Sequence, residues 1–126
     1  MYDFLDNKAV LITGGTGFFG EELVSRLLKL PKVRKVVIYS RDEFKQHLMA
    51  ERYDDKRLRC YLGDIRDLSR LKRAFEDIDY VIHAAALKQV PILEENPFEA
   101  VKTNIQGSQN VIEAALNCGV QQVMAL

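Results

Sequence analysis

Short apolar runs alternate along the chain with segments in which apolar residues recur at helical spacing. Five runs have the length and residue types of strands, and they cover 8–13, 33–39, 58–62, 80–84 and 121–126. Continuous apolar strands are typical of a parallel sheet covered on both faces. Because strands and helices alternate and crossovers are right-handed, the pattern predicts an α/β fold. It is a doubly wound parallel sheet with five strands in the order 3-2-1-4-5.

Four helices are expected between these strands. The first has an apolar face made of Leu23, Val24, Leu27 and Leu28, and Pro31 stops it. Phe44 and Leu48 suggest a short, charged helix, and a third helix repeats Leu68, Leu71 and Phe75. The fourth has Asn96 as a cap, Pro97 at the first helical position and Gly119 at its end. Its apolar face is expected to hold Val101, Ile105, Ile112 and Ala115.

Composition narrows the class of protein. With 126 residues, the chain suits one domain, residues 1–126. Lys and Arg total 18, as do Asp and Glu, and no basic run occurs, which argues against nucleic acid or an anionic membrane as the main partner. No apolar run could span a bilayer, and the first residues do not resemble a signal peptide. Cys60 and Cys118 are far apart in sequence and are expected to be reduced thiols. We therefore expect a cytoplasmic protein.

A glycine-rich turn follows the first strand, in the sequence Thr13-Gly14-Gly15-Thr16-Gly17-Phe18-Phe19-Gly20. Gly14 allows a tight turn, Gly17 lets the backbone approach a pyrophosphate, and Gly20 lets the helix pack closely. The following helix then offers free N–H groups and its positive dipole end to phosphates. This strand-turn-helix context predicts a dinucleotide site in a Rossmann-type sheet. The alternative is a turn without a ligand.

The end of the second strand predicts which dinucleotide binds. This position holds Ser40, Arg41, Asp42 and Glu43, followed by Lys45. A hydroxyl and a guanidinium suit the 2′-phosphate of NADP, which we favour. Asp42 could instead bind the ribose of NAD, and Arg41 and Lys45 could simply be solvated.

Further candidates follow the third and fourth strands. Asp64 and Ile65 lie where the edge of an adenine ring is expected, although Asp64 could be a plain turn residue. Ala84, Ala85 and Ala86 fall at the switch-point crevice, where small side chains suit a flat cofactor. Lys88 follows at the mouth of the crevice. His83 is expected to be a packed, hydrogen-bonded residue, and the histidine and cysteine spacing gives no metal site.

Several blocks together resemble one family. The glycine loop matches extended short-chain dehydrogenases, and 39–43, 63–67, 83–91, 96–99 and 102–107 narrow the match. The chain resembles the N-terminal part of inverting UDP-N-acetylglucosamine 4,6-dehydratases, from bacterial pathways to surface sugars such as pseudaminic acid. The resemblance implies NADP contacts from Thr16 to Phe19, from Ser40 to Lys45, and from Asp64, Ile65, Ala85 and Lys88. It also implies a UDP-sugar substrate and a supporting role for Asn104 in the active site.

The family's catalytic groups are not found in this sequence. A Ser or Thr followed by Asp-Lys is expected after the fifth strand, and no tyrosine here is followed four places on by lysine. The chain alone is therefore expected to be inactive. An unpaired fifth strand also predicts self-association, and so a homo-oligomer. Two alternatives stay open: a non-catalytic NADP-binding module, and a related sugar-nucleotide epimerase or reductase.

Overall fold

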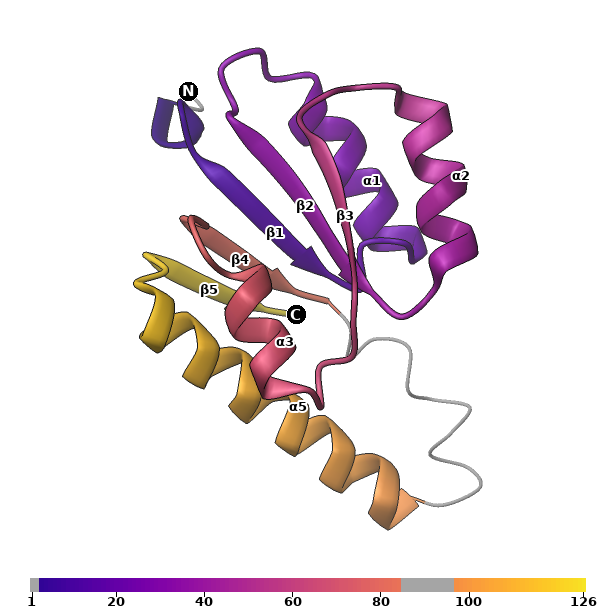
Figure 1. The fold of residues 1–126 in the computed structure, drawn as a ribbon, viewed down its shortest axis with the longest axis vertical. Coiled ribbons are helices and arrows are strands. Elements are labelled where there is room, and N and C mark those ends of the chain that lie inside the picture. Colours follow the sequence, from indigo (N-terminus) through magenta and orange to yellow (C-terminus); the bar gives the residue numbers. More distant parts are fainter. Residues whose placement is uncertain (1–2, 85–96) are drawn as a thin grey trace.

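The computed structural model describes residues 3–84 and 97–126, which form a five-stranded sheet with helices on both sides (Figure 1). The strands are β1 (Ala9–Thr13), β2 (Lys35–Ser40), β3 (Leu58–Leu62), β4 (Tyr80–His83) and β5 (Gln122–Ala125). Neighbouring strands pair in parallel in the order β3-β2-β1-β4-β5. The fold class and strand order predicted from the sequence are confirmed.

The helices form two layers around this sheet. Helices α1 (Phe18–Leu28) and α2 (Glu43–Tyr53) lie on one side, and α3 (Leu68–Ala74) and α5 (Pro97–Cys118) lie on the other (Figure 1). A short 3-10 turn, η1 (Asp3–Leu5), precedes β1. Val10 and Ile12 of β1 pack in one core cluster and Leu11 in the other. Side-chain alternation along the central strands therefore builds one core under each layer.

The inner face of α5 differs from the predicted one. Ile105 and Ile112 are more than half exposed, whereas Asn110, Val111 and Ala114 are buried. The prediction for Ile105 and Ile112 was wrong because it placed the bulkiest apolar residues inside. Small side chains and Asn110 form the inner face instead, which lets α5 approach α3 and the sheet closely.

The short, charged helix predicted from Phe44 and Leu48 is α2. Phe44 and Leu48 are exposed, and Gln46 and Met49 are the buried residues of this helix. The helix extends to Tyr53 and ends at Asp54, which has a left-handed backbone with φ of 43°. The end of α5 was predicted correctly, since Gly119 follows Cys118 with φ of 71°. The expected cap, Asn96, lies outside the described residues.

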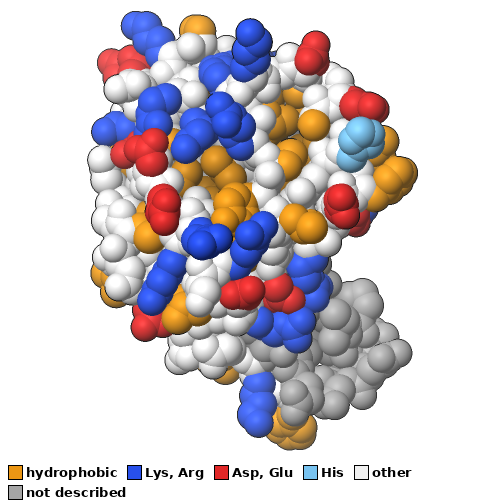
Figure 2. All heavy atoms as spheres, in the orientation of Figure 1, with side chains coloured by type: hydrophobic (Ala, Val, Ile, Leu, Met, Phe, Trp, Pro, Cys, Tyr) orange, Lys and Arg blue, Asp and Glu red, His pale blue; other side chains and the backbone are white. Residues whose placement is uncertain are grey.

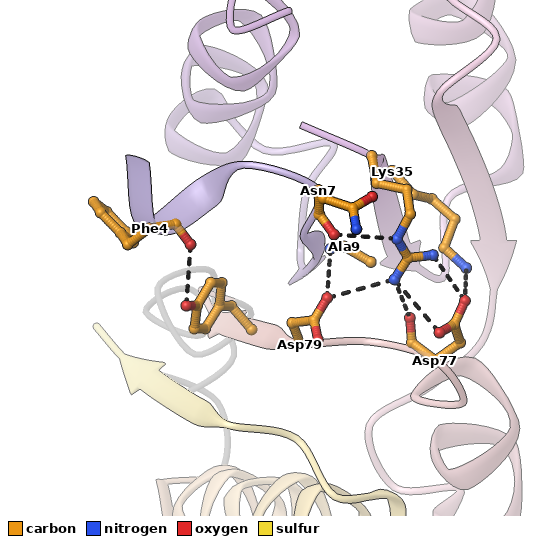
Figure 3. A network of polar contacts seen from close by, with 8 residues as sticks. Phe4, Asn7, Ala9, Lys35, Asp77 and Asp79 are labelled. Carbon is orange, nitrogen blue, oxygen red and sulfur yellow. Dashed lines mark hydrogen bonds and ion pairs between the residues drawn. The ribbon is translucent and has the colours of Figure 1, made fainter. Parts of the chain in front are cut away.

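A polar network ties together the amino ends of β1 and β4 (Figure 3). Arg34 Nη1 lies 2.8 Å from Asp77 Oδ2, and Arg34 Nη2 lies 3.4 Å from Asp79 Oδ2. Asp79 Oδ2 also accepts a hydrogen bond of 2.8 Å from the amide of Ala9. This network lies at the opposite end of the sheet from the glycine loop.

The surface carries mixed charges on the face shown in Figure 2, where basic and acidic side chains are interspersed with apolar ones. Within residues 3–84 and 97–126, no helix has the length and apolar character needed to cross a membrane. The four residues of β5 are exposed, and Met124 has a relative exposure of 60%. The double cover expected from the sequence is therefore complete only over the central strands.

Candidate functional site

The glycine loop makes a tight turn between β1 and α1. Gly14 has φ of 71°, in the left-handed region that favours glycine, and its amide donates to the carbonyl of Tyr39 at 2.9 Å. A Cβ on Gly20 would lie 2.6 Å from the Cα of Gly15, so α1 packs directly against the loop. Gly15 itself faces Ile38, because a Cβ there would lie 2.7 Å from its side chain. The expected roles of Gly14 and Gly20 fit this geometry, and the packing role of Gly15 was not predicted.

The N-terminus of α1 is open toward the loop. Gly17 is the N-cap and makes no side-chain capping bond, and Phe18 and Phe19 in the first turn are exposed. Thr16 is 6% exposed, and its buried Oγ1 has no hydrogen-bond partner within the described part of the chain. Buried hydroxyls are rarely left without a partner. An anion at this helix end would supply an acceptor for Thr16 and for the helix N–H groups.

The end of β2 carries one exposed cation, Arg41, and two side chains that stabilise the fold, Ser40 and Asp42. Arg41 is well exposed, and its Nη1 lies 3.7 Å from Asp64 Oδ2. Asp42 caps α2, because its Oδ1 accepts from the amide of Lys45 at 3.0 Å. Ser40 is 8% exposed, and its Oγ accepts from Gln46 Nε2 at 2.9 Å. Glu43 and Lys45 are exposed in the first turn of the helix.

Asp64 follows β3 and is held by Arg66. Arg66 Nη2 lies 2.7 Å from Asp64 Oδ2, and this hydrogen-bonded ion pair holds the pKa of Asp64 below its usual range. The carboxylate is therefore charged at neutral pH and can act only as an acceptor. Ile65 is partly buried and packs against the core on the α3 and α5 side.

His83 ends β4 and joins three elements. Its Nδ1 lies 2.7 Å from Thr13 Oγ1 on β1, and its Nε2 lies 3.4 Å from Ser108 Oγ on α5. The amide of Ala84 donates to Thr13 Oγ1 at 3.1 Å. His83 is 3% exposed, and burial lowers its pKa. The prediction of a packed, hydrogen-bonded histidine is confirmed.

The carboxyl ends of β1, β2, β3 and β4 bring most of the predicted residues to one edge of the sheet. Backbone hydrogen bonds join the loops after β1 and β3 to the end of β2, from the amide of Gly14 to the carbonyl of Tyr39 and from the amide of Gly63 to that of Ser40, at 2.9 Å each. Asn104 is partly buried on α5, and its Oδ1 has no partner among the described residues. Ala85, Ala86 and Lys88 lie outside the described residues.

Sequence reasoning missed several polar residues beneath this edge. Gln46 is 6% exposed and bonds both to Ser40 and to the carbonyl of Tyr61. Asn110 and the hydroxyl of Tyr39 bond to the backbone after β3. The sequence does not single out Asn110, because Asn104, Gln106 and Gln109 nearby on the same helix are also polar.

Comparison with known proteins decides the family. The family described as "Polysaccharide biosynthesis protein" matches residues 10–126. The chain belongs to this family. As a polysaccharide biosynthesis family member, it is 51% identical over 121 residues to the UDP-N-acetylglucosamine 4,6-dehydratase (inverting) of Campylobacter jejuni. That match covers 96% of this chain and 36% of the dehydratase, so the chain spans about a third of its relative. The resemblance predicted from the sequence is confirmed.

Other similar proteins are named for activities other than that of the Campylobacter dehydratase. The UDP-glucose 4-epimerase of Rickettsia massiliae is 45% identical over 126 residues, covering 98% of this chain and 37% of the epimerase. The X-ray structure of Pen from Bacillus thuringiensis has a TM-score of 0.88 at 48% identity, covering 97% of this chain and 37% of that one. DesIV, a dTDP-glucose 4,6-dehydratase from Streptomyces venezuelae solved with NAD bound, has a TM-score of 0.79 at 31% identity, covering 91% and 38%.

Proposed function

We propose that this chain binds NADP as the cofactor-binding portion of a UDP-N-acetylglucosamine 4,6-dehydratase that supplies bacterial surface sugars of the pseudaminic acid type. The main support for a bound dinucleotide is the buried hydroxyl of Thr16. It has no hydrogen-bond partner in the described structure and lies at the uncapped N-terminus of α1. A pyrophosphate at this position would accept from that hydroxyl and from the N–H groups of the first turn.

Each loop has a role toward the cofactor under this proposal. The Gly14–Gly20 loop holds the pyrophosphate, and Arg41 binds the 2′-phosphate. Asp64 and Ile65 meet the edge of the adenine, and Ala84, Ala85, Ala86 and Lys88 lie along the nicotinamide half. A bound NADP⁺ would supply the redox chemistry: it would accept a hydride from carbon 4 of the sugar and return it to carbon 6 after water has been lost across carbons 5 and 6. Asn104 supports the active site, whose proton-transfer groups would come from residues outside 1–126.

The choice of NADP over NAD depends on the end of β2. Asp42 Oδ1 caps α2 by accepting from the amide of Lys45, so this carboxylate has a structural role whether or not it contacts a ribose. Arg41 is exposed, and its Nη1 lies 3.7 Å from Asp64 Oδ2. A guanidinium free to swing toward a 2′-phosphate favours NADP. DesIV has NAD bound, so this feature would separate the chain from that relative.

Titration of the natural full-length protein with NADP⁺ and NAD⁺ tests the cofactor. Arg41→Ala should weaken NADP⁺ binding by roughly tenfold to a hundredfold, which corresponds to a lost charge-assisted hydrogen bond, and should change NAD⁺ binding little. Arg26→Ala, which removes an exposed arginine of α1, is the matched control. Equal affinity of the unmodified protein for both dinucleotides would remove the case for NADP.

An epimerase is the second candidate, because relatives at 45% identity carry that name. Incubation of the full-length protein with UDP-N-acetylglucosamine separates the two. A 4-keto-6-deoxy sugar nucleotide would support the dehydratase, and the C4 epimer alone would support the epimerase. Binding of NADP without turnover of any UDP-sugar would support a non-catalytic module.

A further inference from the structure

Two successive backbone carbonyls after β3 accept hydrogen bonds from buried side chains of two different elements, β2 and α5. Tyr39 Oη donates to the carbonyl of Asp64 at 2.7 Å, and Asn110 Nδ2 donates to the carbonyl of Ile65 at 3.0 Å. Tyr39 lies on β2 and is 1% exposed, and Asn110 lies on α5 and is 4% exposed. Carbonyls in a surface turn can accept from water, so neither bond is needed simply to satisfy the backbone.

Two glycines make room for this arrangement. A Cβ on Gly63 would lie 2.4 Å from the hydroxyl of Tyr39, and a Cβ on Gly107 would lie 2.4 Å from Cδ1 of Ile65. Gly63 therefore admits the tyrosine hydroxyl beneath the turn, and Gly107 admits the isoleucine side chain against α5. Asn110 is itself fixed, because its Oδ1 accepts from Gln106 Nε2 at 3.0 Å.

The bond from Tyr39 also sets the direction of a donor. In a trans peptide, the N–H of Ile65 points opposite to the carbonyl of Asp64. That N–H is therefore directed away from the hydroxyl of Tyr39. The charged Asp64 carboxylate, held by Arg66, lies on the same segment. A carboxylate acceptor beside an N–H donor matches the amine and ring nitrogen at the edge of an adenine.

We infer that Tyr39 and Asn110 are positioning residues that fix the Asp64–Ile65 segment in the orientation that reads the adenine edge of the cofactor. This inference rests on the proposed function. It adds that base selectivity is set by two buried residues that do not touch the ligand. Preorganised hydrogen-bonding groups discriminate strongly against a base that lacks the matching group.

The test is selectivity between NADP⁺ and its deamino analogue, in which hypoxanthine replaces adenine, measured on the full-length protein. The unmodified protein should bind NADP⁺ more tightly. Tyr39→Phe, which removes one oxygen, should narrow the affinity ratio by roughly threefold to tenfold, the equivalent of one neutral hydrogen bond. Asn110→Ala should narrow it similarly.

Matched controls remove the same groups elsewhere. Tyr80→Phe deletes a hydroxyl that donates to the carbonyl of Phe4 at the amino end of the sheet, and Asn117→Ala deletes an exposed amide on the same helix. Both should leave the ratio unchanged. If Tyr39→Phe only loosens the structure, it should weaken the binding of both dinucleotides equally, and that result would overturn the inference. Equal affinity of the unmodified protein for both dinucleotides would also overturn it. If the unmodified protein binds neither, the proposed function itself fails.

Discussion

Arg57 donates to the carbonyls of Leu28, Leu30 and Val33, at distances of 2.6 to 3.1 Å, and pairs with Asp55 at 2.9 Å. These carbonyls belong to the end of α1 and to the turn that leads into β2. The side chain thus supplies hydrogen-bond donors to carbonyls at and after a helix end, where the last carbonyls have no intrahelical partner. Nothing in the sequence marks Arg57 among eighteen basic residues, because its partners are backbone atoms far along the chain.

Replacing Arg57 should therefore destabilise the protein. Arg57→Met keeps most of the apolar stem but leaves several partly buried carbonyls without a donor, at a cost of about 2–3 kcal/mol in the free energy of unfolding. Urea unfolding measures this change. Arg59→Met, which removes an exposed arginine that donates to the carbonyl of Lys56, should cost under about 0.5 kcal/mol. Similar midpoints for the two variants would contradict the role of Arg57.

At the scale of elements, Asp42 at the start of α2 could act as a helix cap or as a ribose ligand, and substitutions distinguish the two roles. Asp42→Ala removes the acceptor for the amide of Lys45 and should cost about 1 kcal/mol of stability, whereas Asp42→Ser can restore the cap. Thermal unfolding of both variants measures the effect. Neither should weaken dinucleotide binding at a temperature where the protein is folded, and a large loss of NAD⁺ affinity in both would show instead that Asp42 contacts the ribose.

The elements show how far the sequence could predict the fold. Strand positions and order followed from apolar runs, since β1 and β2 are buried on both faces and leave no choice of period. Helix faces were less predictable. Ile105 and Ile112 were expected on the inner face of α5 but are exposed, because small residues and Asn110 allow closer packing on the inner side. Likewise, the loops of the candidate site were found from their glycines, while Tyr39 and Asn110 beneath them depend on contacts that only the fold creates.

At the scale of the molecule, His83 connects β1, β4 and α5, and it makes stability depend on pH. Burial lowers the pKa of His83 in the folded state below the ordinary value of 6.5. The unfolded chain therefore binds a proton more readily, so the contribution of the neutral imidazole is complete above pH about 6.5 and is lost as pH falls from there through the folded-state pKa.

Unfolding midpoints between pH 5 and pH 7.5 measure this contribution. The unmodified protein should lose stability toward pH 5, and His83→Gln should lose less over the same interval, although it begins less stable. His47→Gln, which removes the exposed histidine of α2, is the control. An identical pH dependence in the unmodified protein and His83→Gln would show that the buried imidazole is not responsible.

The Arg34, Asp77 and Asp79 network lies at the amino ends of the strands, away from the loops proposed to hold the cofactor. Mutations that change the cofactor preference of those loops need not disturb this network of ion pairs and hydrogen bonds. The ion pairs at the amino ends of the strands are therefore distant from the loop after β2. Exchanging residues 40–45 with those of relatives named as dehydratases or epimerases should alter cofactor preference while this network stays in place, provided that the exchanged segment keeps the cap of α2.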